Sequence, residues 1–251
     1  KNTVRTSIVN QLDETGWRVA GHLEWLWVAV NEQVTVYSIL PGRGFEEASS
    51  ILGKDYDGFL NHDGWAPYYR FTGAYHQTCI SHLIRRCEDL IKVASPCAAR
   101  FPLSVMQLLF KGLKLRDRHR LGNISQHGLY VATGRLVNAM DRLLARTFHL
   151  PANRRLAKHL RHEQPHLFTC LHCPGIEATN NAAEQAIRPA VIARKTWGGN
   201  RTKNGARAQQ ILASVLRTCR QQGKDSFSRL IGLLRSPSQQ ILDLVPATLS
   251  P

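Results

Sequence analysis

The sequence lacks the two features that would direct the chain into a membrane or out of the cell. No window approaches the roughly 18 consecutive apolar residues that a membrane-spanning helix needs, and no charged-then-apolar leader opens the chain. Cysteine is also sparse, because six irregularly placed cysteines in 251 residues argue against a disulfide scaffold and for a reducing compartment. We therefore expect a soluble cytoplasmic protein with no membrane partner.

Acidic residues are scarce as well. The chain has 18 Asp and Glu against 33 Lys and Arg, and its formal charge of +15 favours a polyanionic partner, with nucleic acid as the first candidate. Residues 1–70 carry a net charge of −3, whereas residues 71–184 and 185–251 each carry +9. A carboxylate site that binds cations within a polyanion-binding surface would have this distribution.

Length and hydrophobic pattern predict one large domain, or one domain that carries an insertion. Three strand-like runs come first, namely SIVNQLDETGW, which ends at a turn near Gly16, then HLEWLWVAVN and VTVYSIL. Next come GFEEASSILG, typical of a short helix, GFLNHDGW, typical of a buried strand ending at Asp63, and YHQTCISHLIRRCEDLIKVA, typical of a strand and a basic helix. This order predicts an α/β fold with a mixed sheet and flanking helices.

Helical patterns dominate from residue 95 to about residue 170, which predicts an all-helical insertion. Its apolar faces are expected at Met106, Leu109, Phe110 and Leu113, and at Leu136, Met140, Leu143, Leu144 and Phe148. N-cap chemistry at 179–181 predicts a helix that carries Glu184 and that Pro189 should end or kink. An amphipathic helix follows, with an apolar face formed by Ala208, Ile211, Leu212, Val215, Leu216 and Cys219.

Three acids lie at positions where adjacent strands would bring them together. Asp13 ends the first strand, Asp63 ends the fourth, and Glu184 lies near the start of the helix after the insertion. Clustered carboxylates repel one another, whereas two Mg²⁺ ions ~3.5 to 4 Å apart neutralise them and clamp a phosphodiester for in-line attack. The pattern indicates metal-dependent polynucleotidyl transfer, with Mn²⁺ as an alternative ion.

Asp13 could have a structural role without metal, and a neighbouring acid could bind the metal in its place. It would serve equally as a solvated turn acid before Gly16, and Glu14 beside it is an alternative metal ligand. Strand alternation sends the two acidic side chains to opposite faces, so only one of them can join the site.

The other two acids also have ordinary interpretations. Asp63 begins an Asp-Gly pair, which is common in turns, and Asp55 and Asp57 are nearby alternatives. Glu184 fits an acid in the first turn of a helix, where the helix dipole favours negative charge.

Two pairs of residues have zinc-ligand spacing. Cys79 and His82 form a C-x2-H pair, and Cys170 and Cys173 form a C-x2-C pair. An 87-residue gap separates the pairs, and cysteines of this kind are commonly small buried hydrophobes. We therefore do not expect structural zinc, and we expect Cys79 and His82 to support the core near the three acids.

The run RPAVIARKTWGGNRTKNGAR has one Trp, three Gly and no acid, which is typical of a loop that follows nucleic acid. A solvated basic loop is the ordinary interpretation. The candidates for phosphate contact are Arg188, Arg194, Lys195, Arg201, Lys203 and Arg207.

Four stretches resemble the catalytic core of the insertion-sequence sixty-six transposases, namely LDETGWRV, NHDGWAPY, CISHLIRR and ATNNAAEQAIRPAVIARKTWGGN. The resemblance covers nearly the whole chain. It implies a ribonuclease H-like fold interrupted by a helical insertion, and a DDE triad on Asp13, Asp63 and Glu184. It also implies that full-length relatives carry N-terminal DNA-binding regions, and that the protein acts as a homo-oligomer on DNA in the bacterial cytoplasm, where it is nucleoid-associated.

The resemblance divides the chain into a first part of the core (1–94), the helical insertion (95–170), a second part with the basic loop and amphipathic helix (171–235), and a C-terminal tail (236–251). Asp13 would contact both Mg²⁺ ions, and Asp63 and Glu184 would complete one site each. The expected activity is cleavage at transposon ends, after which the freed 3′-hydroxyl attacks target DNA. Two alternatives stay open: an inactive remnant that binds DNA, and a nuclease of the same fold that does not join ends.

Overall fold

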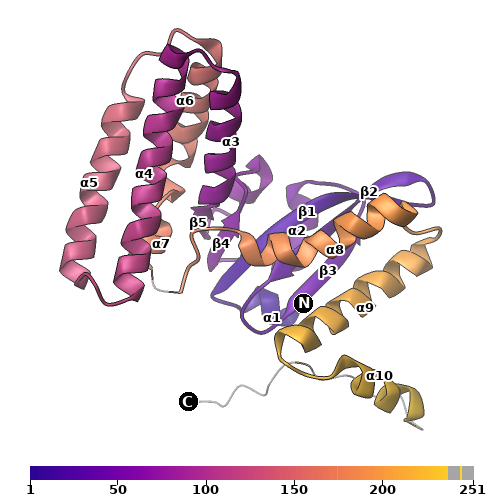
Figure 1. Ribbon diagram of the computed structural model, residues 1–251. Coiled ribbons are helices and arrows are strands. Elements are labelled where there is room, and N and C mark those ends of the chain that lie inside the picture. The colour runs from indigo at the N-terminus through magenta and orange to yellow at the C-terminus, as the bar shows by residue number, and fades with distance from the viewer. Residues whose placement is uncertain (174, 237–243, 245–251) are drawn as a thin grey trace. The chain divides into compact units, whose positions relative to one another are not determined.

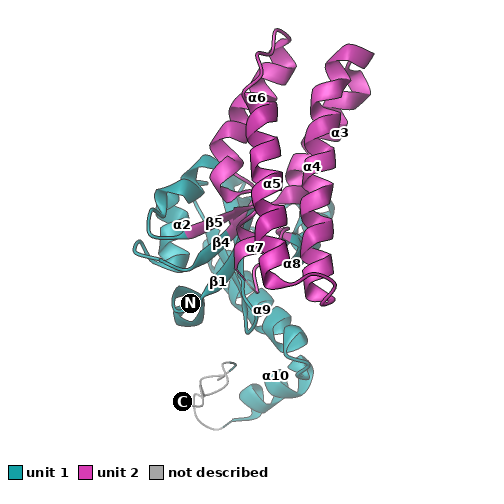
Figure 2. Cartoon of the chain, turned by 90° about the vertical axis from the view of Figure 1, so that its left-hand side faces the viewer, with its two compact units in different colours: residues 1–60, 65–74, 181–251 teal, residues 61–64, 75–180 magenta. Residues whose placement is uncertain are grey.

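The computed structural model describes residues 1–173, 175–236 and 244 (Figure 1). The chain forms two compact units, coloured separately in Figure 2. Unit 1 contains residues 1–60, 65–74 and the chain from residue 181 onward, and unit 2 contains residues 61–64 and 75–180. Most of the predicted tail, 236–251, lies outside the described residues. No helix among the described residues is long and apolar enough to cross a membrane.

A five-stranded mixed sheet has the strand order β3-β2-β1-β4-β5. The strands are β1 (Val9–Val19), β2 (His22–Val30), β3 (Thr35–Leu40), β4 (Phe59–His62) and β5 (Tyr75–Thr78). The first three, which match the three strand-like runs expected from the sequence, form an antiparallel meander. The backbone N–H of Phe59 donates to the carbonyl of Ile8 at 2.7 Å, so β4 starts beside the start of β1.

The turn after β1 lies later in the chain than the sequence predicts. Gly16 is inside the strand and pairs with Trp25, and the ladder continues to Val19 and His22. The chain reverses at Ala20 and Gly21, whose φ angles of 51° and 82° are those of a type I′ turn. The prediction of a turn near Gly16 was therefore wrong, because pairing with β2 holds this glycine in the strand.

One face of the sheet is covered by α1 (Asn2–Arg5), α2 (Phe45–Leu52) and the 3-10 helix η1 (Ala66–Arg70). Leu12 and Trp27 from the sheet, Ile51 from α2 and Tyr68 from η1 belong to one buried core on this face. The helix α2 was predicted, and its first turn is fixed by Glu47, whose Oε2 accepts the backbone N–H of Gly44 at 3.0 Å.

The opposite face of the sheet is covered by α8 (Asn181–Trp197), and α9 (Lys203–Gln221) packs beside β3 (Figure 1). Ala183, Ala186 and Ile187 of α8 share a buried core with Trp17 and Val28 of the sheet. A last helix, α10 (Ser226–Arg235), follows Asp225, whose carboxylate accepts the backbone N–H groups of its first turn. Unit 1 is therefore a sheet with helices on both faces.

Polar side chains bind α9 to the edge strand β3. The backbone N–H groups of Thr35, Tyr37 and Ile39 donate to Thr218 Oγ1, Ser214 Oγ and Gln210 Oε1 at 3.1, 2.8 and 2.8 Å. A step of four residues along a helix is about 6 Å, close to the ~6.8 Å of two residues along a strand, so the two series stay in register. The predicted apolar face is largely exposed, since Ile211 and Leu212 are 51% and 47% exposed.

Unit 2 is mainly helical, as predicted for the chain after residue 95. Its helices are α3 (Ile80–Val93), α4 (Pro96–Arg120), α5 (Gln126–Leu144), α6 (Pro151–Glu163), the 3-10 helix η2 (Gln164–His166) and α7 (Thr169–His172). Leu109, Leu136 and Met140 are buried, but Phe110 is 43% exposed and does not belong to the buried face of α4. Gly112 is part of the buried face of α4 instead. It packs closely against Phe168, because a Cβ at Gly112 would lie 2.8 Å from the Phe168 ring.

Candidate active site and nucleic-acid interface

Asp13 lies on the face of the sheet that α8 covers. Its cross-strand partner in β2 is Val28, which belongs to the core under α8 together with Trp17, four residues farther along β1. Asp13 is half-buried, and its Oδ1 accepts the backbone N–H of Glu14 at 2.9 Å. Of the two neighbouring acids, Asp13 is therefore the one on the α8 face.

Glu14 points to the opposite face and is engaged there. Its side chain is 1% exposed, pairs with Arg43 Nε at 2.5 Å and accepts a hydrogen bond from the hydroxyl of Tyr68. The guanidinium of Arg43 also lies over the rings of Trp25 and Trp65, 5.0 and 4.3 Å from their centroids. Glu14 is thus part of the packing of the α1 and α2 face.

The helix α8 lies along β1 and runs in the same direction. At its start, the backbone N–H of Ala182 donates to Gln11 Oε1 at 3.1 Å. Near its end, Arg194 Nη1 donates to Thr15 Oγ1 at 3.0 Å and to the carbonyl of Gly16 at 2.6 Å. From Gln11 to Gly16 the strand covers about 17 Å, and from Ala182 to Arg194 the helix covers about 18 Å, so the two stay aligned.

This alignment brings Asp13 and Glu184 to the same end of the α8 and β1 layer. Asp13 lies two residues after Gln11 on the same face of β1, and Glu184 lies two residues after Ala182 in the first turn of α8. Glu184 is half-buried. The start of a helix also favours negative charge, because its backbone N–H groups point outward there.

Pro189 does not end α8, so of the two outcomes expected there, an end or a kink, the end was wrong. The helix continues to Trp197 with Pro189 inside it. Proline removes one helical hydrogen bond, but Val191 and Ala193 beyond it pack against the core of this face, and Arg194 is tied to β1. These tertiary contacts offset the cost of the proline.

Asp63 belongs to unit 2 and directly follows β4 in a half-buried turn. His62 holds this turn, because its Nδ1 accepts the backbone N–H of Gly64 at 3.0 Å. The Nε2 of His62 lies 3.0 Å from Nδ1 of His76, whose ring is 5.2 Å from that of His166. Asp55 and Asp57, the alternative acids, are exposed and precede β4, so the strand separates them from Asp63.

The protonation of this histidine chain follows from its contacts. His62 is fully buried, and burial, followed by the charges of His76 and His166, lowers its pKa well below 6.5. A neutral imidazole has one N–H. Because Nδ1 of His62 accepts from Gly64, its proton is on Nε2, which donates to Nδ1 of His76.

Glu163, at the end of α6, supports the same turn from within unit 2. It is fully buried and accepts a hydrogen bond from Thr78 Oγ1 at 2.6 Å. The φ angle of Gly64 is 88°, a backbone conformation that favours glycine, and a Cβ there would make a tight contact of 3.3 Å with this carboxylate. The sequence analysis missed these supports, although His62 directly before Asp63 was a visible signal.

The basic candidates lie on two helices and a short turn, and not on one long loop as predicted. Arg188, Arg194 and Lys195 are on α8, Arg201 is in the turn between the helices, and Lys203 and Arg207 are on α9. All are exposed except Arg194, which is half-buried and anchors α8 to β1. Asn200 Oδ1 accepts the indole N–H of Trp17 at 2.7 Å and fixes the turn on β1.

The two cysteine pairs do not form one zinc site. Cys79 Sγ accepts the backbone N–H of Asn180 at 3.2 Å, and burial raises the pKa of Cys170 to about 12 and also raises that of Cys173. Among the described residues, neither Cys170 nor Cys173 belongs to a cluster of three close metal-ligating side chains. Cys79 and Cys170 are buried, as expected for packing residues.

Comparisons with known proteins give three findings. The family model of the transposase IS66 family matches residues 1–208. An uncharacterized protein of Sinorhizobium fredii, y4qI, is 23% identical over 254 residues, which cover 90% of this chain and 47% of that protein, so the chain spans about half of this relative's length. The catalytic core domain of the HTLV-2 integrase, solved with magnesium in a dimeric form, is 17% identical over 38% of this chain and 81% of that domain, with a TM-score of 0.22.

Proposed function

Because the chain belongs to the transposase IS66 family, we propose that it is the catalytic core of a DDE transposase. In this proposal it cleaves DNA at transposon ends and joins the freed ends to target DNA. The mixed sheet is then the centre of a ribonuclease H-like fold, and the helices within residues 95–170 are its insertion.

The observation that carries the proposal is that Asp13 and Glu184 lie at the same end of the layer formed by β1 and α8. Residues 171 positions apart in the sequence lie at one end of the layer formed by β1 and α8, each two residues from the hydrogen bond between Gln11 and Ala182. Carboxylates that converge on one phosphate repel each other unless a cation neutralises them. In the proposal, a bound cation neutralises both acids at this end of the layer.

Asp63 is the third acid of the proposed triad. Its strand, β4, is the neighbour of β1 in the sheet. Asp13 and Asp63 each come four residues after the first residue of their strands, Val9 and Phe59. His62, Gly64 and Glu163 keep the Asp63 turn in one conformation.

Mg²⁺ fits this donor set, because carboxylate oxygens are the ligands that it prefers, and Mn²⁺ takes the same ligands. We assign Asp13 to both ions of a pair, and Asp63 and Glu184 to one ion each. When bound, the ions supply electrostatic stabilisation of the charge that builds on the phosphate. The protein holds the three carboxylates, orients the phosphodiester and keeps the helix start beside it.

The two proposed steps balance as substitutions at phosphorus. In the first, the oxygen of water forms a bond to phosphorus, and the 3′ oxygen of the transposon end leaves as a hydroxyl. In the second, this 3′ oxygen forms a bond to a target phosphorus, and the 3′ oxygen of the target strand leaves. Exposed cations of α8 and α9 (Arg188, Lys195, Arg201, Lys203 and Arg207) contact the phosphates, and the protein acts as a homo-oligomer on paired ends.

A cleavage and joining assay tests the proposal with the full-length protein and a labelled transposon-end duplex. Asp13→Asn, Asp63→Asn and Glu184→Gln should each abolish Mg²⁺-dependent cleavage and spare DNA binding. The matched control, Glu14→Gln, should retain cleavage. Retained cleavage in all three single variants contradicts the triad, and cleavage without joined products by the wild-type protein identifies a nuclease.

A further inference from the structure

A basic groove lies between α3 and α6, within unit 2. It has a volume of about 580 Å³ and is lined by Arg85 and Arg86 of α3 and by Arg155 of α6, among others. A second hollow of about 470 Å³ follows α6 and is lined by Arg154, Arg155 and Lys158. Because Arg155 lines both, they form one continuous surface. We call Arg86, Arg154, Arg155 and Lys158 the α6 basic surface.

The charge of this surface is not neutralised by acids. Within the described part of the chain, none of its four cations lies within ion-pair distance of a carboxylate. The one acid of α6, Glu163, is fully buried. Asp89, which also lines the groove, pairs with Lys92 at 2.8 Å.

Not every cation of α6 is available to a ligand. Arg161 donates through Nε and Nη2 to the carbonyl of Leu144, at 3.2 and 2.6 Å, and so ties α6 to the end of α5. Arg154, Arg155 and Lys158 are exposed and lie within about 6 Å along the helix axis. That length is close to two base-pair steps of ~3.4 Å. The spacing of the three cations along the helix is therefore similar to the spacing of phosphates along a DNA backbone.

We propose that the α6 basic surface is a second DNA-binding site, which holds the phosphate backbone of duplex DNA. The proposal rests on the proposed function, because it takes DNA as the substrate class. The contacts are with phosphates, so the site positions DNA without reading its sequence.

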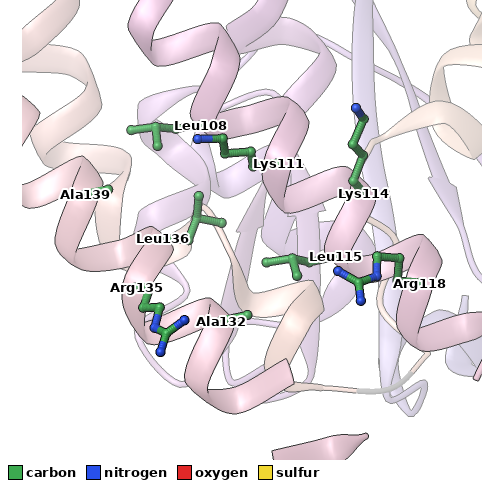
Figure 3. Close-up of a pocket in the computed structure, with 9 residues that line it drawn as sticks. All are labelled: Leu108, Lys111, Lys114, Leu115, Arg118, Ala132, Arg135, Leu136 and Ala139. Carbon is green, nitrogen blue, oxygen red and sulfur yellow. The ribbon is translucent and has the colours of Figure 1, made fainter. Parts of the chain in front are cut away.

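A second basic groove in the same unit provides a matched control. It has a volume of about 370 Å³ and lies between α4 and α5, where Lys111, Lys114 and Arg118 surround a floor that includes Leu115 and Leu136 (Figure 3). The apolar side chains of this floor cannot form hydrogen bonds with a phosphate. Removal of these three cations lowers the net charge of the protein by the same amount as removal of three cations from the α6 basic surface. The control therefore separates a local contact from general electrostatic attraction.

The experiment measures fluorescence anisotropy of a labelled random-sequence DNA duplex with the full chain in EDTA, over a series of salt concentrations. Each phosphate contact contributes ~0.9 to the slope of log K against log salt. The variant R154Q/R155Q/K158Q should therefore lower the slope by about 2 to 3 and weaken binding by about tenfold or more. The control variant K111Q/K114Q/R118Q should lower the slope by less than about 1.

Equal losses in the two triple variants, or no loss in R154Q/R155Q/K158Q, overturn the proposal. The charge-preserving variant R154K/R155K/K158R should bind like the wild type, and a tenfold loss in that variant also overturns it. Because binding is measured without metal, failure of this site and failure of the triad are distinguishable. The triad is tested by cleavage in the Asp13→Asn variant, which should bind DNA normally.

Discussion

The backbone N–H of Ala182 donates a hydrogen bond to the side chain of Gln11, at 3.1 Å. This contact joins the first turn of α8 to β1 near the start of that strand. Asp13 and Glu184 each lie two residues beyond it, so this hydrogen bond helps to hold the two acids at the same end of the layer.

Gln11→Ala should slow DNA cleavage without weakening DNA binding. The loss of this hydrogen bond should lower the free energy of unfolding by about 1 kcal/mol. The larger effect should be on kcat, about 10- to 100-fold, because Glu184 loses its fixed position relative to Asp13. Steady-state cleavage kinetics should show kcat reduced and KM for DNA unchanged. Gln33→Ala, at an exposed turn position, is the control, and equal kcat values in the two variants would count against the positioning role.

Arg194 and Lys195 are neighbours that should respond oppositely to substitution. Arg194 donates two hydrogen bonds to β1, so Arg194→Ala should lower the free energy of unfolding by about 2 kcal/mol. Lys195 is exposed, so Lys195→Ala should change stability by less than about 0.5 kcal/mol but reduce the salt dependence of DNA binding. Urea unfolding and anisotropy measure the two effects, and the reverse pattern would contradict the assignment.

Ser214→Ala should destabilise the protein more than Leu216→Ala does. Ser214 accepts the backbone N–H of Tyr37 on the edge strand β3, and loss of that acceptor should cost about 1 to 3 kcal/mol. Leu216 is 43% exposed, so its truncation should cost less. Thermal unfolding compares the two variants. Aggregation of Ser214→Ala through the uncovered edge is also expected, and a larger loss in Leu216→Ala would refute the docking of α9.

His159 should make the protein less stable in mild acid. Burial lowers the pKa of His159 from 6.5 to about 4, and the charges of Arg86 and His162 contribute to the decrease. These effects outweigh the nearby carboxylate of Glu163, which lies 3.8 Å away. Between these pH values the unfolded chain binds more protons than the folded one, so the free energy of unfolding falls as pH drops from about 6.5 to 4. Urea unfolding of His159→Gln should show a smaller fall than the wild type, and an identical fall would exclude His159 as the cause.

Local patterns in the sequence predicted much of the fold. The meander, α2, β4, the step from β5 to α3 and the helical region after residue 95 were predicted because alternation and helical periodicity are strong there. The same reasoning assigned Asp13 and Glu14 to opposite faces, and the structure confirms this division through Val28 and Tyr68.

The features that the sequence could not predict depend on contacts between distant residues. Gln210 and Ser214 accept backbone N–H groups from the edge strand β3, which lies more than 170 residues earlier in the sequence. Local rules placed a turn at Gly16 and allowed α8 to end at Pro189, and strand pairing and packing override both. The support of the Asp63 turn by Glu163 likewise joins residues about 100 positions apart, whose types alone give no sign of contact.

The most direct test of the central claim is Mn²⁺ binding to the full chain, measured by electron paramagnetic resonance. The account predicts that Asp13→Asn and Glu184→Gln each reduce Mn²⁺ affinity by tenfold or more, on the order expected for loss of a charged ligand, whereas Glu14→Gln binds Mn²⁺ like the wild type. Wild-type affinity in both Asp13→Asn and Glu184→Gln would contradict a shared cation site on the α8 face of the sheet.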